Sequence, residues 1–564
     1  MRSTYKMSEE KTQPNSFHSE SATDASGFKN AAASQSRIEK HSDVESIQNA
    51  PYQDAEGPGL VRQLKNRHIA MISIGGVIGT GLFLGTGGSL QVGGPIGLLL
   101  GYTVVGSVCW SVMVSLGEMV AYLPIPGGHI KLAERFVDRA LSFTMGWNYW
   151  YNWTVILPAE LSAAALLINY WDRDTSLNPA WISICLVVVI IINMCGAGVY
   201  GEAEFIFASI KVITITGLII LGIVLDLGGG PNHDRIGFRY WKEPFNQYNG
   251  ISGAKGRFLG WWAVMTQAAF SFIGTEIVAI AAGEAKNPRR NIPKAIKRVY
   301  IRILLFYIGG TIVIGLLVPQ DSPGLGLGTD AASSPFVIAI QNAGISGLPS
   351  VINAALLTSA WSAASSDLYT SSRALYGLAL AGNAPKIFAK TLKNGLPVVS
   401  LIFCACFSLL AFMGVNSGSG KVFSWFQSMT AVAGLMTWFG ISVTYLRFYA
   451  GLKAQGIDRT ALPFASKLQP YVAWYSMIAC FVMCFFSGWS VFLEGKWATD
   501  TFITNYLPLM LFPILYVGAK LYYKDPVKPA SSMDFISDIK EIEATQWPDE
   551  TPKNKLEAFW AWLM

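Results

Sequence analysis

Apolar residues occur in runs of about twenty between residues 69 and 522, and short polar stretches separate the runs. A helix of that length spans the hydrocarbon core of a bilayer. The pattern therefore predicts an all-α integral membrane protein with twelve transmembrane helices. The predicted ranges are 69–91, 95–122, 141–169, 179–199, 204–226, 260–283, 300–319, 348–379, 397–414, 422–446, 471–493 and 503–522.

Lysine and arginine gather in alternate loops between these ranges. Because short basic loops stay in the cytoplasm, we expect these loops and both termini to be cytoplasmic. The loop of residues 227–259 is basic and should face out, but it is long and also acidic, so its charge has little weight. The basic residues after the second, sixth, eighth and tenth ranges are Lys131, Arg135, Arg139, Lys286, Arg289, Arg290, Lys294, Lys297, Arg298, Lys386, Lys390, Lys393, Arg447, Lys453, Arg459 and Lys467.

Composition divides the chain into a polar tail of residues 1–58, an apolar part of residues 59–523 and a second polar tail of residues 524–564. Residues 1–58 have too few apolar side chains to form a core, so we expect this cytoplasmic tail to be disordered. Its lysines lie beside serine and threonine, which suits recognition by the ubiquitination machinery, although a plain solvated tail explains them as well. These lysines are Lys6, Lys11, Lys29 and Lys40.

The second tail ends in a short apolar pattern. Leu556, Phe559, Trp560 and Leu563 have helical spacing, so they form one face that can lie on the inner leaflet of the membrane. A degradation or export signal is the alternative interpretation.

The composition fits a membrane protein and argues against several other classes. Of the 564 residues, 52% are hydrophobic and 14% are charged, and the mean hydropathy is +0.38. The formal net charge of +6 comes from the loop clusters, so it does not indicate a nucleic acid partner. The seven cysteines lie in apolar runs without metal-finger spacing, and none of the five histidines lies in a predicted span. We therefore expect neither an enzyme centre nor a cofactor or metal site.

The first range contains GGVIGTGLF, residues 75–83, in which four glycines fall within seven positions. Each interior glycine costs about 1 kcal/mol of helix stability relative to alanine. Unsatisfied backbone groups are costly in hydrocarbon, so an opened helix at this point indicates a polar ligand. Alternatively, Gly75, Gly79, Gly81 and Gly85 form two GxxxG motifs that let helices pack closely.

The sixth range repeats this pattern, because IGTE at residues 273–276 resembles IGTG at residues 78–81. Paired breaks in the two halves of a transporter mark its binding site. A half-helix that begins at Thr80 and Gly81 points free N–H groups at a carboxylate, and carbonyl groups freed before each break face an ammonium group. A zwitterionic amino acid fits both.

Several ionisable residues lie inside the predicted ranges, where each costs at least about 2.5 kcal/mol at the bilayer centre and is a candidate for function. Glu276 adjoins the second break, either as a functional carboxylate or as a helix cap. Glu160 either pairs with another buried charge or shapes the pocket for the substrate side chain. Asp367 and Arg373 are expected to form a local ion pair or to be solvated near a helix end.

Lys211 is the candidate for a proton that is gained and lost during transport. Its neighbours Ile210, Val212 and Ile213 are aliphatic, and we expect burial among them to disfavour the charged ammonium group.

Four stretches resemble the fungal amino acid permeases of the amino acid, polyamine and organocation transporter superfamily. They are RHIAMISIGGVIGTGLFLGTG, GEMVAYLPIPGG, FSFIGTEIVAIAAGEAKNPRRNIPKAI and SSRALYGLALAGNAPKIF, at residues 67–87, 117–128, 270–296 and 371–388. The resemblance implies an inverted-repeat fold in which helices 1–5 and 6–10 are related by a pseudo-two-fold axis, with helices 1 and 6 broken. Helices 11 and 12 are additional.

The resemblance also implies roles for individual residues. By similarity to bacterial arginine/agmatine exchangers, Thr80 and Gly81 hold the substrate carboxylate, while the carbonyls of Val77, Phe270 and Ile273 hold its ammonium group. The ring of Phe270 closes over the substrate, Glu276 responds to pH, and Lys211 stands where other members bind sodium. The expected substrate-binding set is Val77, Gly79, Thr80, Gly81, Glu160, Phe270, Ile273 and Gly274, and the expected proton-coupling pair is Lys211 and Glu276.

We therefore expect a proton-coupled importer of amino acids in the plasma membrane that works by alternating access. An amino acid sensor of the same fold and an exchanger or exporter of an internal membrane are the rival interpretations. The substrate range stays open, because the sequence does not reveal which residues meet around the substrate side chain.

Overall fold

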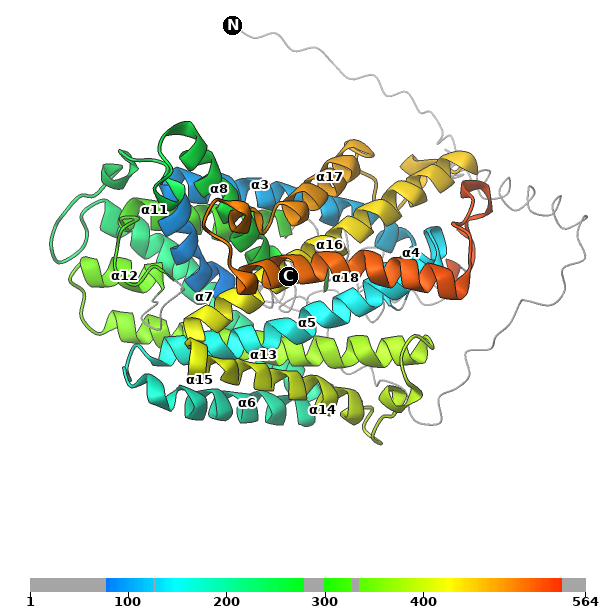
Figure 1. Ribbon diagram of the computed structural model, residues 1–564, viewed down its shortest axis with the longest axis horizontal. Coiled ribbons are helices and arrows are strands. Elements are labelled where there is room, and N and C mark those ends of the chain that lie inside the picture. Colours follow the sequence, from blue (N-terminus) through cyan, green and yellow to red (C-terminus); the bar gives the residue numbers. More distant parts are fainter. Residues whose placement is uncertain (1–77, 126, 278–298, 327–333, 540–564) are drawn as a thin grey trace, which may run out of the picture.

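The computed structural model describes residues 78–125, 127–277, 299–326 and 334–539, and no strand occurs among them (Figure 1). Val77, the tail of residues 1–58 and the apolar pattern at residues 556–563 lie outside the described residues.

Each of the twelve predicted ranges overlaps a helix. By length and composition, eight of the described segments can cross a membrane, while α8 and α13 are too polar for this criterion and α17 is too short. The principal helices are η1 (Gly81–Gly85), α3 (Thr86–Tyr122), α4 (Gly128–Phe136), α5 (Arg139–Ile168), α6 (Asn178–Met194), α7 (Ala197–Asp226), α8 (Gly253–Phe272), η5 (Ile303–Ile308), α11 (Gly309–Leu317), α12 (Pro335–Asn342), α13 (Leu348–Leu380), α14 (Val398–Phe407), η7 (Ser408–Met413), α15 (Gly414–Ser417), α16 (Ser419–Ala454), α17 (Tyr471–Phe485) and α18 (Thr499–Tyr523).

The first two predicted ranges meet inside α3. Gly94 has a φ of 72°, which glycine adopts without strain, and Pro95 follows it. The backbone N–H of Ile96 donates to the carbonyl of Pro244 at 2.9 Å, so a distant loop satisfies a group that the interrupted helix leaves free. The chain therefore changes direction at the boundary that the sequence predicts.

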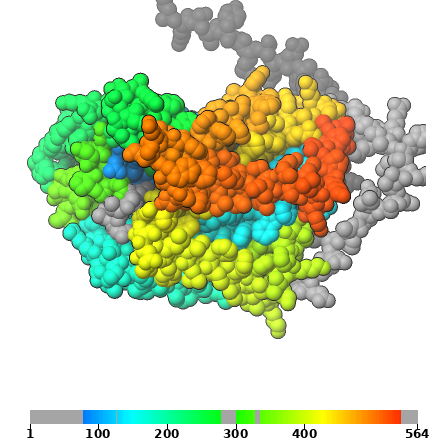
Figure 2. All heavy atoms as spheres, viewed as in Figure 1, coloured from blue at the N-terminus to red at the C-terminus, as the bar shows by residue number. Residues whose placement is uncertain are grey.

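Helix α5 lies in the interior of the bundle, packed against α13, α16 and α18. Figure 2 shows residues of α18 and parts of α16 covering much of one face, and α5 appears only in narrow gaps alongside α18. Asp138 starts α5 by accepting a hydrogen bond from the backbone N–H of Leu141 at 2.7 Å.

The peripheral helices expose large apolar side chains, as expected for a surface that faces lipid. Ile213 on α7 is 72% exposed, so it does not help to bury Lys211 as the sequence suggested. Other exposed apolar residues on these helices are Ile184, Val187, Ile191, Ile206, Ile220, Ile402, Ile478, Phe481, Phe485, Ile514, Val517 and Leu521.

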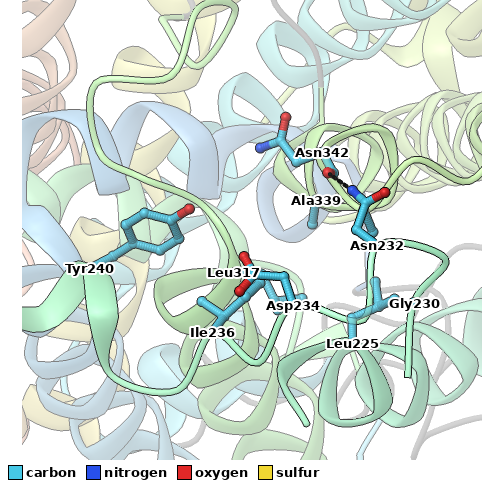
Figure 3. A pocket seen from close by; sticks show the side chains of 10 residues that line it. Leu225, Gly230, Asn232, Asp234, Ile236, Tyr240, Leu317, Ala339 and Asn342 are labelled. Atoms are coloured by element: carbon cyan, nitrogen blue, oxygen red, sulfur yellow. Dashed lines mark hydrogen bonds between the residues drawn. The ribbon is translucent and has the colours of Figure 1, made fainter. Parts of the chain in front are cut away.

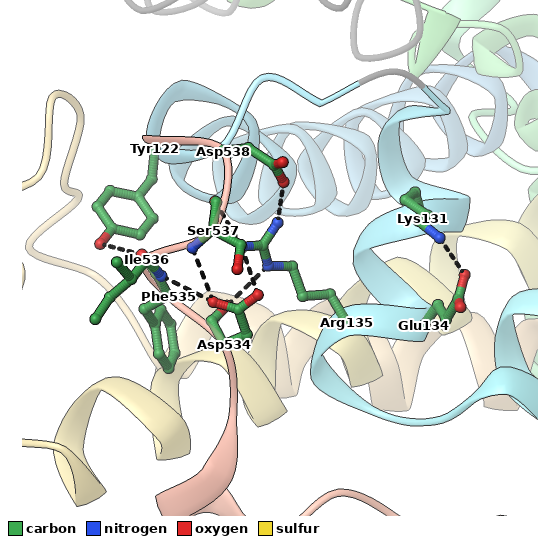
Figure 4. Close-up of polar contacts among 9 residues, drawn as sticks. All are labelled: Tyr122, Lys131, Glu134, Arg135, Asp534, Phe535, Ile536, Ser537 and Asp538. Carbon is green, nitrogen blue, oxygen red and sulfur yellow. Dashed lines mark hydrogen bonds and ion pairs between the residues drawn. The ribbon is translucent and has the colours of Figure 1, made fainter. Parts of the chain in front are cut away.

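At one end of the bundle, the chain that follows α18 returns and packs against α3, α4 and α16 (Figures 1 and 4). Phe535 is 1% exposed and contacts the rings of Phe136 and Phe448. The side chain of Arg135 on α4 forms ion pairs with Asp534 at 3.0 Å and Asp538 at 2.6 Å. The segment from Lys524 to Ile539, the first part of the predicted second tail, is thus attached to the helices.

The opposite end carries a small hollow between α7, α11 and α12, with a volume of about 70 Å³ (Figure 3). Leu225, Ile236, Leu317 and Tyr240 line it together with polar groups, and Asp234 at its rim is paired with Arg239 at 2.7 Å. None of the predicted substrate residues lies there.

Candidate substrate site

The first described helix begins at the predicted position. Ile78 and Gly79 are not helical, the helical backbone begins at Thr80, whose side chain makes no capping hydrogen bond, and Gly81–Gly85 form a π-helical turn that continues into α3. The first N–H groups of a helix have no partner within the helix and carry its positive dipole end. Gly79 and Thr80 are therefore placed where an anionic group is favoured.

Helix α8 ends at the second predicted position. Ile273 has extended backbone with a ψ of 147°, and Gly274 has a φ of 93°, which a residue with a side chain rarely adopts. The chain then turns at once, because the N–H of Ile277 donates to the carbonyl of Gly274 at 3.1 Å.

The start of η1 and the end of α8 lie against each other. A Cβ atom added at Gly81 would be 2.9 Å from Cα of Ser271 and 2.9 Å from the ring of Phe270. The hydroxyls of Tyr102 and Ser271 are hydrogen-bonded at 2.9 Å, which links α3 to the last turn of α8. Gly81 is thus required for close packing, as the alternative interpretation of the glycines holds, and it also lies at a helix start.

Glu160 joins these elements from α5. Its Oε1 accepts a hydrogen bond from the hydroxyl of Thr80 at 2.9 Å, while its Oε2 is buried without a hydrogen-bond partner in the described part of the chain. A Cβ atom at Gly79 would be 3.4 Å from Oε1. Pro158 lies two residues earlier, and its missing N–H frees a carbonyl of the preceding turn. The carboxylate of Glu160, with one oxygen that has no hydrogen-bond partner in the described residues, therefore lies beside the non-helical backbone at Ile78 and Gly79.

Lys211 points from α7 into the same interior. It is 1% exposed, and its Nζ has no hydrogen-bond partner among the described residues. Three carboxylates act on it electrostatically: Glu204, Glu160 and Asp367. Lys211 and these three acids thus form a buried cluster of one cation and three carboxyl groups, and in the interior charges interact strongly while their burial is costly.

Sequence reasoning missed Glu204 and misjudged Asp367. Glu204 is 1% exposed and accepts a hydrogen bond from Ser362 at 2.7 Å. It precedes Lys211 by seven residues, a spacing that places both on one helix face and could have revealed it.

Asp367 and Arg373 do not form the expected local pair, and Asp367 is not solvated. Asp367 is 2% exposed and faces the Lys211 cluster, whereas the guanidinium of Arg373 lies 3.2 Å from the ring centroid of Tyr369. Six residues on a helix turn through more than one and a half turns, so the two side chains leave α13 in different directions.

Glu276 lies in a second polar cluster. It is fully buried, its Oε2 accepts a hydrogen bond from the indole N–H of Trp438 at 3.1 Å, and its Oε1 has no hydrogen-bond partner in the described residues. Arg302, another buried charge that the sequence did not single out, donates to the neighbouring Thr275 at 3.3 Å. Glu276 therefore has different neighbours from those of Lys211.

An interior with opened helix ends and buried charges, enclosed by lipid-facing helices, is characteristic of membrane transport proteins. The chain belongs to the amino acid permease family, whose model matches residues 68–530. It is 43% identical to a proline-specific permease of Emericella nidulans over 89% of this chain and 93% of that protein.

Two permeases of Saccharomyces cerevisiae are similarly close. A dicarboxylic amino acid permease is 43% identical over 86% of this chain and 81% of its own length. A lysine-specific permease is 41% identical over 92% of this chain and 84% of its own length. Relatives of nearly equal similarity thus carry names with different substrates, although all are amino acid permeases.

Proposed function

We propose that this protein imports amino acids across the plasma membrane together with protons, through twelve spanning helices with both termini in the cytoplasm. The observation that supports the proposal most is the meeting of the η1 start with the α8 end beside Glu160, where Thr80 and the carboxylate are 2.9 Å apart. Alternating access around such paired breaks is how inverted-repeat transporters work.

The main-chain groups of the amino acid are recognised by the helix breaks. The free N–H groups at Thr80 and Gly81 bind the α-carboxylate, because the positive end of a helix dipole favours an anion. The carbonyls of Val77, Phe270 and Ile273 bind the α-ammonium group, with Gly79 and Gly274 allowing the backbone to open. The ring of Phe270 closes over the bound substrate.

Glu160 sets the preference for the substrate side chain. Its unpartnered Oε2 is the acceptor that a basic or amide side chain can use, and an acidic side chain is repelled by it. The named relatives include proline, dicarboxylic and lysine permeases, so the choice among side chains has to be measured.

Protons provide the driving force. Moving one charge through 100 mV supplies about 2.3 kcal/mol, so one proton at roughly 150 mV and about one pH unit sustains an accumulation of about a thousandfold. Lys211 changes its protonation as the site opens to either side, since it is enclosed by carboxylates that the moving helices can bring closer or remove. Sodium is then unnecessary, and Glu276 responds to the same change from its own cluster.

Uptake in proteoliposomes tests the proposal. Labelled amino acids, one at a time, should accumulate when the outside is acidic and should do so equally with sodium or potassium salts. Methyl esters and N-acetyl derivatives should compete poorly, because each lacks one of the two charged main-chain groups. Binding without any transport would favour a sensor, and strict dependence on an internal substrate would favour an exchanger.

A further inference from the structure

A buried histidine lies outside the substrate site. Gly127 and Gly128 have φ values of 88° and 51°, which glycine tolerates, and they turn the chain so that His129 on α4 points into the bundle. His129 is 0% exposed, and neither ring nitrogen has a hydrogen-bond partner in the described residues. Burial lowers the pKa of His129 to about 3, so its imidazole is neutral in this state.

Tyr149 of α5 lies next to this histidine. The two ring centroids are 5.0 Å apart and the rings meet edge to face. The hydroxyl of Tyr149 is also buried and makes no hydrogen bond among the described residues; the indole N–H of Trp153 on the same helix is its polar neighbour, and Glu276 acts on it electrostatically. Tyr149 is thus the residue that contacts His129 and lies within electrostatic reach of Glu276 at the break after α8.

Further unpartnered polar atoms continue along α5. Both amide atoms of Asn152 and the hydroxyl of Thr154 are buried and lack hydrogen-bond partners within the described ranges. Buried polar groups are almost always hydrogen-bonded, so a row of such groups indicates ordered water between them. By contrast, the charged residues that follow His129 on α4 have partners, since Lys131 pairs with Glu134 and Arg135 with the C-terminal segment.

We propose that Tyr149 and His129 form the exit route by which a proton passes from Glu276 to the cytoplasmic end of the bundle. This inference rests on the proposed proton-coupled import, in which Lys211 and Glu276 form the proton-coupling pair, and it concerns the proton that Glu276 releases. The Glu276 carboxyl gives its proton to the hydroxyl of Tyr149, directly or through water, and this hydroxyl passes its own proton to one imidazole nitrogen. The other imidazole nitrogen releases a proton to water when this end opens, so His129 returns to its neutral form.

The groups around the route define what else titrates there. Glu276 follows α8, and Arg302 lies beside it before η5. Cys109 of α3 is close to both, Tyr307 of η5 is close to Arg302 and Cys109, and α16 contributes the uncharged Trp438. On α5 the neighbouring group is Tyr149 itself. His129 is the one with an ordinary pKa near neutrality, so hydration of the opened end brings it into the range where it can accept and release a proton.

Comparing net uptake with substrate exchange distinguishes proton release from the other steps of transport. Net uptake requires the proton to leave inside, whereas exchange of labelled for unlabelled substrate can proceed on carriers that keep their proton. In proteoliposomes, His129→Gln and Tyr149→Phe should lower net uptake by about tenfold or more, as expected for loss of a proton-transfer group, while exchange stays within about twofold. His129→Phe, which keeps the ring contact with Tyr149, should behave like His129→Gln.

The exposed His233 in the loop after α7 supplies the matched control, and His233→Asn should leave both modes unchanged. When the membrane potential is adjusted so that the total proton driving force stays constant, net uptake by the parent protein should fall as the inside is acidified, and the His129 variants should lose this dependence. Equal losses of net uptake and exchange, or net uptake at the parent rate, would overturn the route while leaving proton-driven import intact. A parent protein that ignores the proton gradient would overturn both proposals.

Discussion

Two charged regions of this protein are built in opposite ways. At one end, the guanidinium of Arg135 donates to four acceptors on the C-terminal segment, namely the carboxylates of Asp534 and Asp538 and the carbonyls of Asp534 and Ser537 (Figure 4). In the interior, the ammonium of Lys211 has no hydrogen bond in the described residues and faces three carboxylates.

The difference separates structural charges from charges that can change state. Four of the five N–H groups of the Arg135 guanidinium are hydrogen-bonded, so loss of its partners would be costly and the residue fixes one arrangement of the helices. A buried amine without hydrogen bonds is held only by the electrostatic field around it, and movement of a few side chains alters its protonation. The number of hydrogen bonds that a buried charged group makes, more than its burial alone, thus indicates whether it is suited to changing its protonation during transport.

Of the changes that test this comparison, removal of the interior cation Lys211 should have the largest effect. Lys211→Met should abolish accumulation against a gradient, a loss of about a thousandfold, while equilibrium binding of substrate stays measurable. Lys211→Arg should keep the charge permanently and slow turnover. Gradient-driven uptake and binding by the purified variants provide the measurement, and pH-dependent accumulation by Lys211→Met would contradict the assignment.

A side chain at Gly81 should have an effect almost as large. Gly81→Val places atoms within 2.9 Å of the Ser271 backbone, so the two helix breaks have to separate and uptake should fall by more than about a hundredfold. Gly79→Ala is the milder control, because its Cβ would lie 3.4 Å from Glu160. Surface labelling should find both variants at the plasma membrane. Retention of Gly81→Val inside the cell would favour a packing role alone.

Glu160→Gln should change the choice of substrate more than the rate. The amide can still accept from Thr80 but no longer carries a charge, so basic competitors should lose about tenfold relative to acidic ones, equivalent to about 1.4 kcal/mol. Competition of many amino acids against one labelled substrate measures the ranking. An unchanged ranking with uniformly lower uptake would assign Glu160 to structure or coupling.

Loss of the ion pairs between Arg135 and the segment after α18 should lower the stability of the protein and change transport very little. Arg135→Gln removes several charge-assisted hydrogen bonds at a partly exposed site and should cost about 1–2 kcal/mol of folding free energy, seen as a lower melting temperature in detergent. Asp525→Asn is the control, since Asp525 lies 3.9 Å from Arg139 with both side chains exposed, and should change the melting temperature very little. Equal melting temperatures for Arg135→Gln and the parent would mean that the segment is not held by these pairs.

The same region should give the smallest effect through pH. Asp534 is partly buried, which raises its pKa, but hydrogen bonds from Ser537 and Ile536 and the charge of Arg135 outweigh this and hold the pKa below its usual value. A carboxyl with a lowered pKa in the folded state stabilises the protein at neutral pH, and this stability is lost as the pH falls through that lowered value. Asp534→Asn should therefore flatten the acid side of the melting profile. A variant with the parent profile would contradict this role of Asp534.

The sequence predicted the helices well because apolar runs of bilayer length are a strong signal. It also predicted that helices begin or end near Thr80 and Ile273, since glycine clusters weaken a helix wherever they occur. Whether those ends bind a substrate stays a prediction. The packing of Met533 and Phe535 at the start of the second tail was not foreseen, because two apolar residues in a polar stretch give no periodic signal.

The sequence could not predict which residues on different helices contact one another. Glu204 lies at the edge of a predicted range, where a carboxylate usually reaches water, and Asp367 has an arginine nearby in the sequence that proved to face another way. His129 was set aside because it lies outside the spans, yet it is buried. In each case the deciding fact is a tertiary contact that no local pattern contains.

The central claim is that Lys211 and the buried carboxylates around it couple amino acid entry to proton entry. Simultaneous recording of internal pH and labelled substrate in proteoliposomes, starting with no ion gradient and only substrate outside, tests it most directly. The account predicts that substrate entry acidifies the interior, at about one proton per amino acid, with or without sodium, and that Lys211→Met abolishes the acidification. Substrate entry with constant internal pH, or entry that requires sodium, would contradict it.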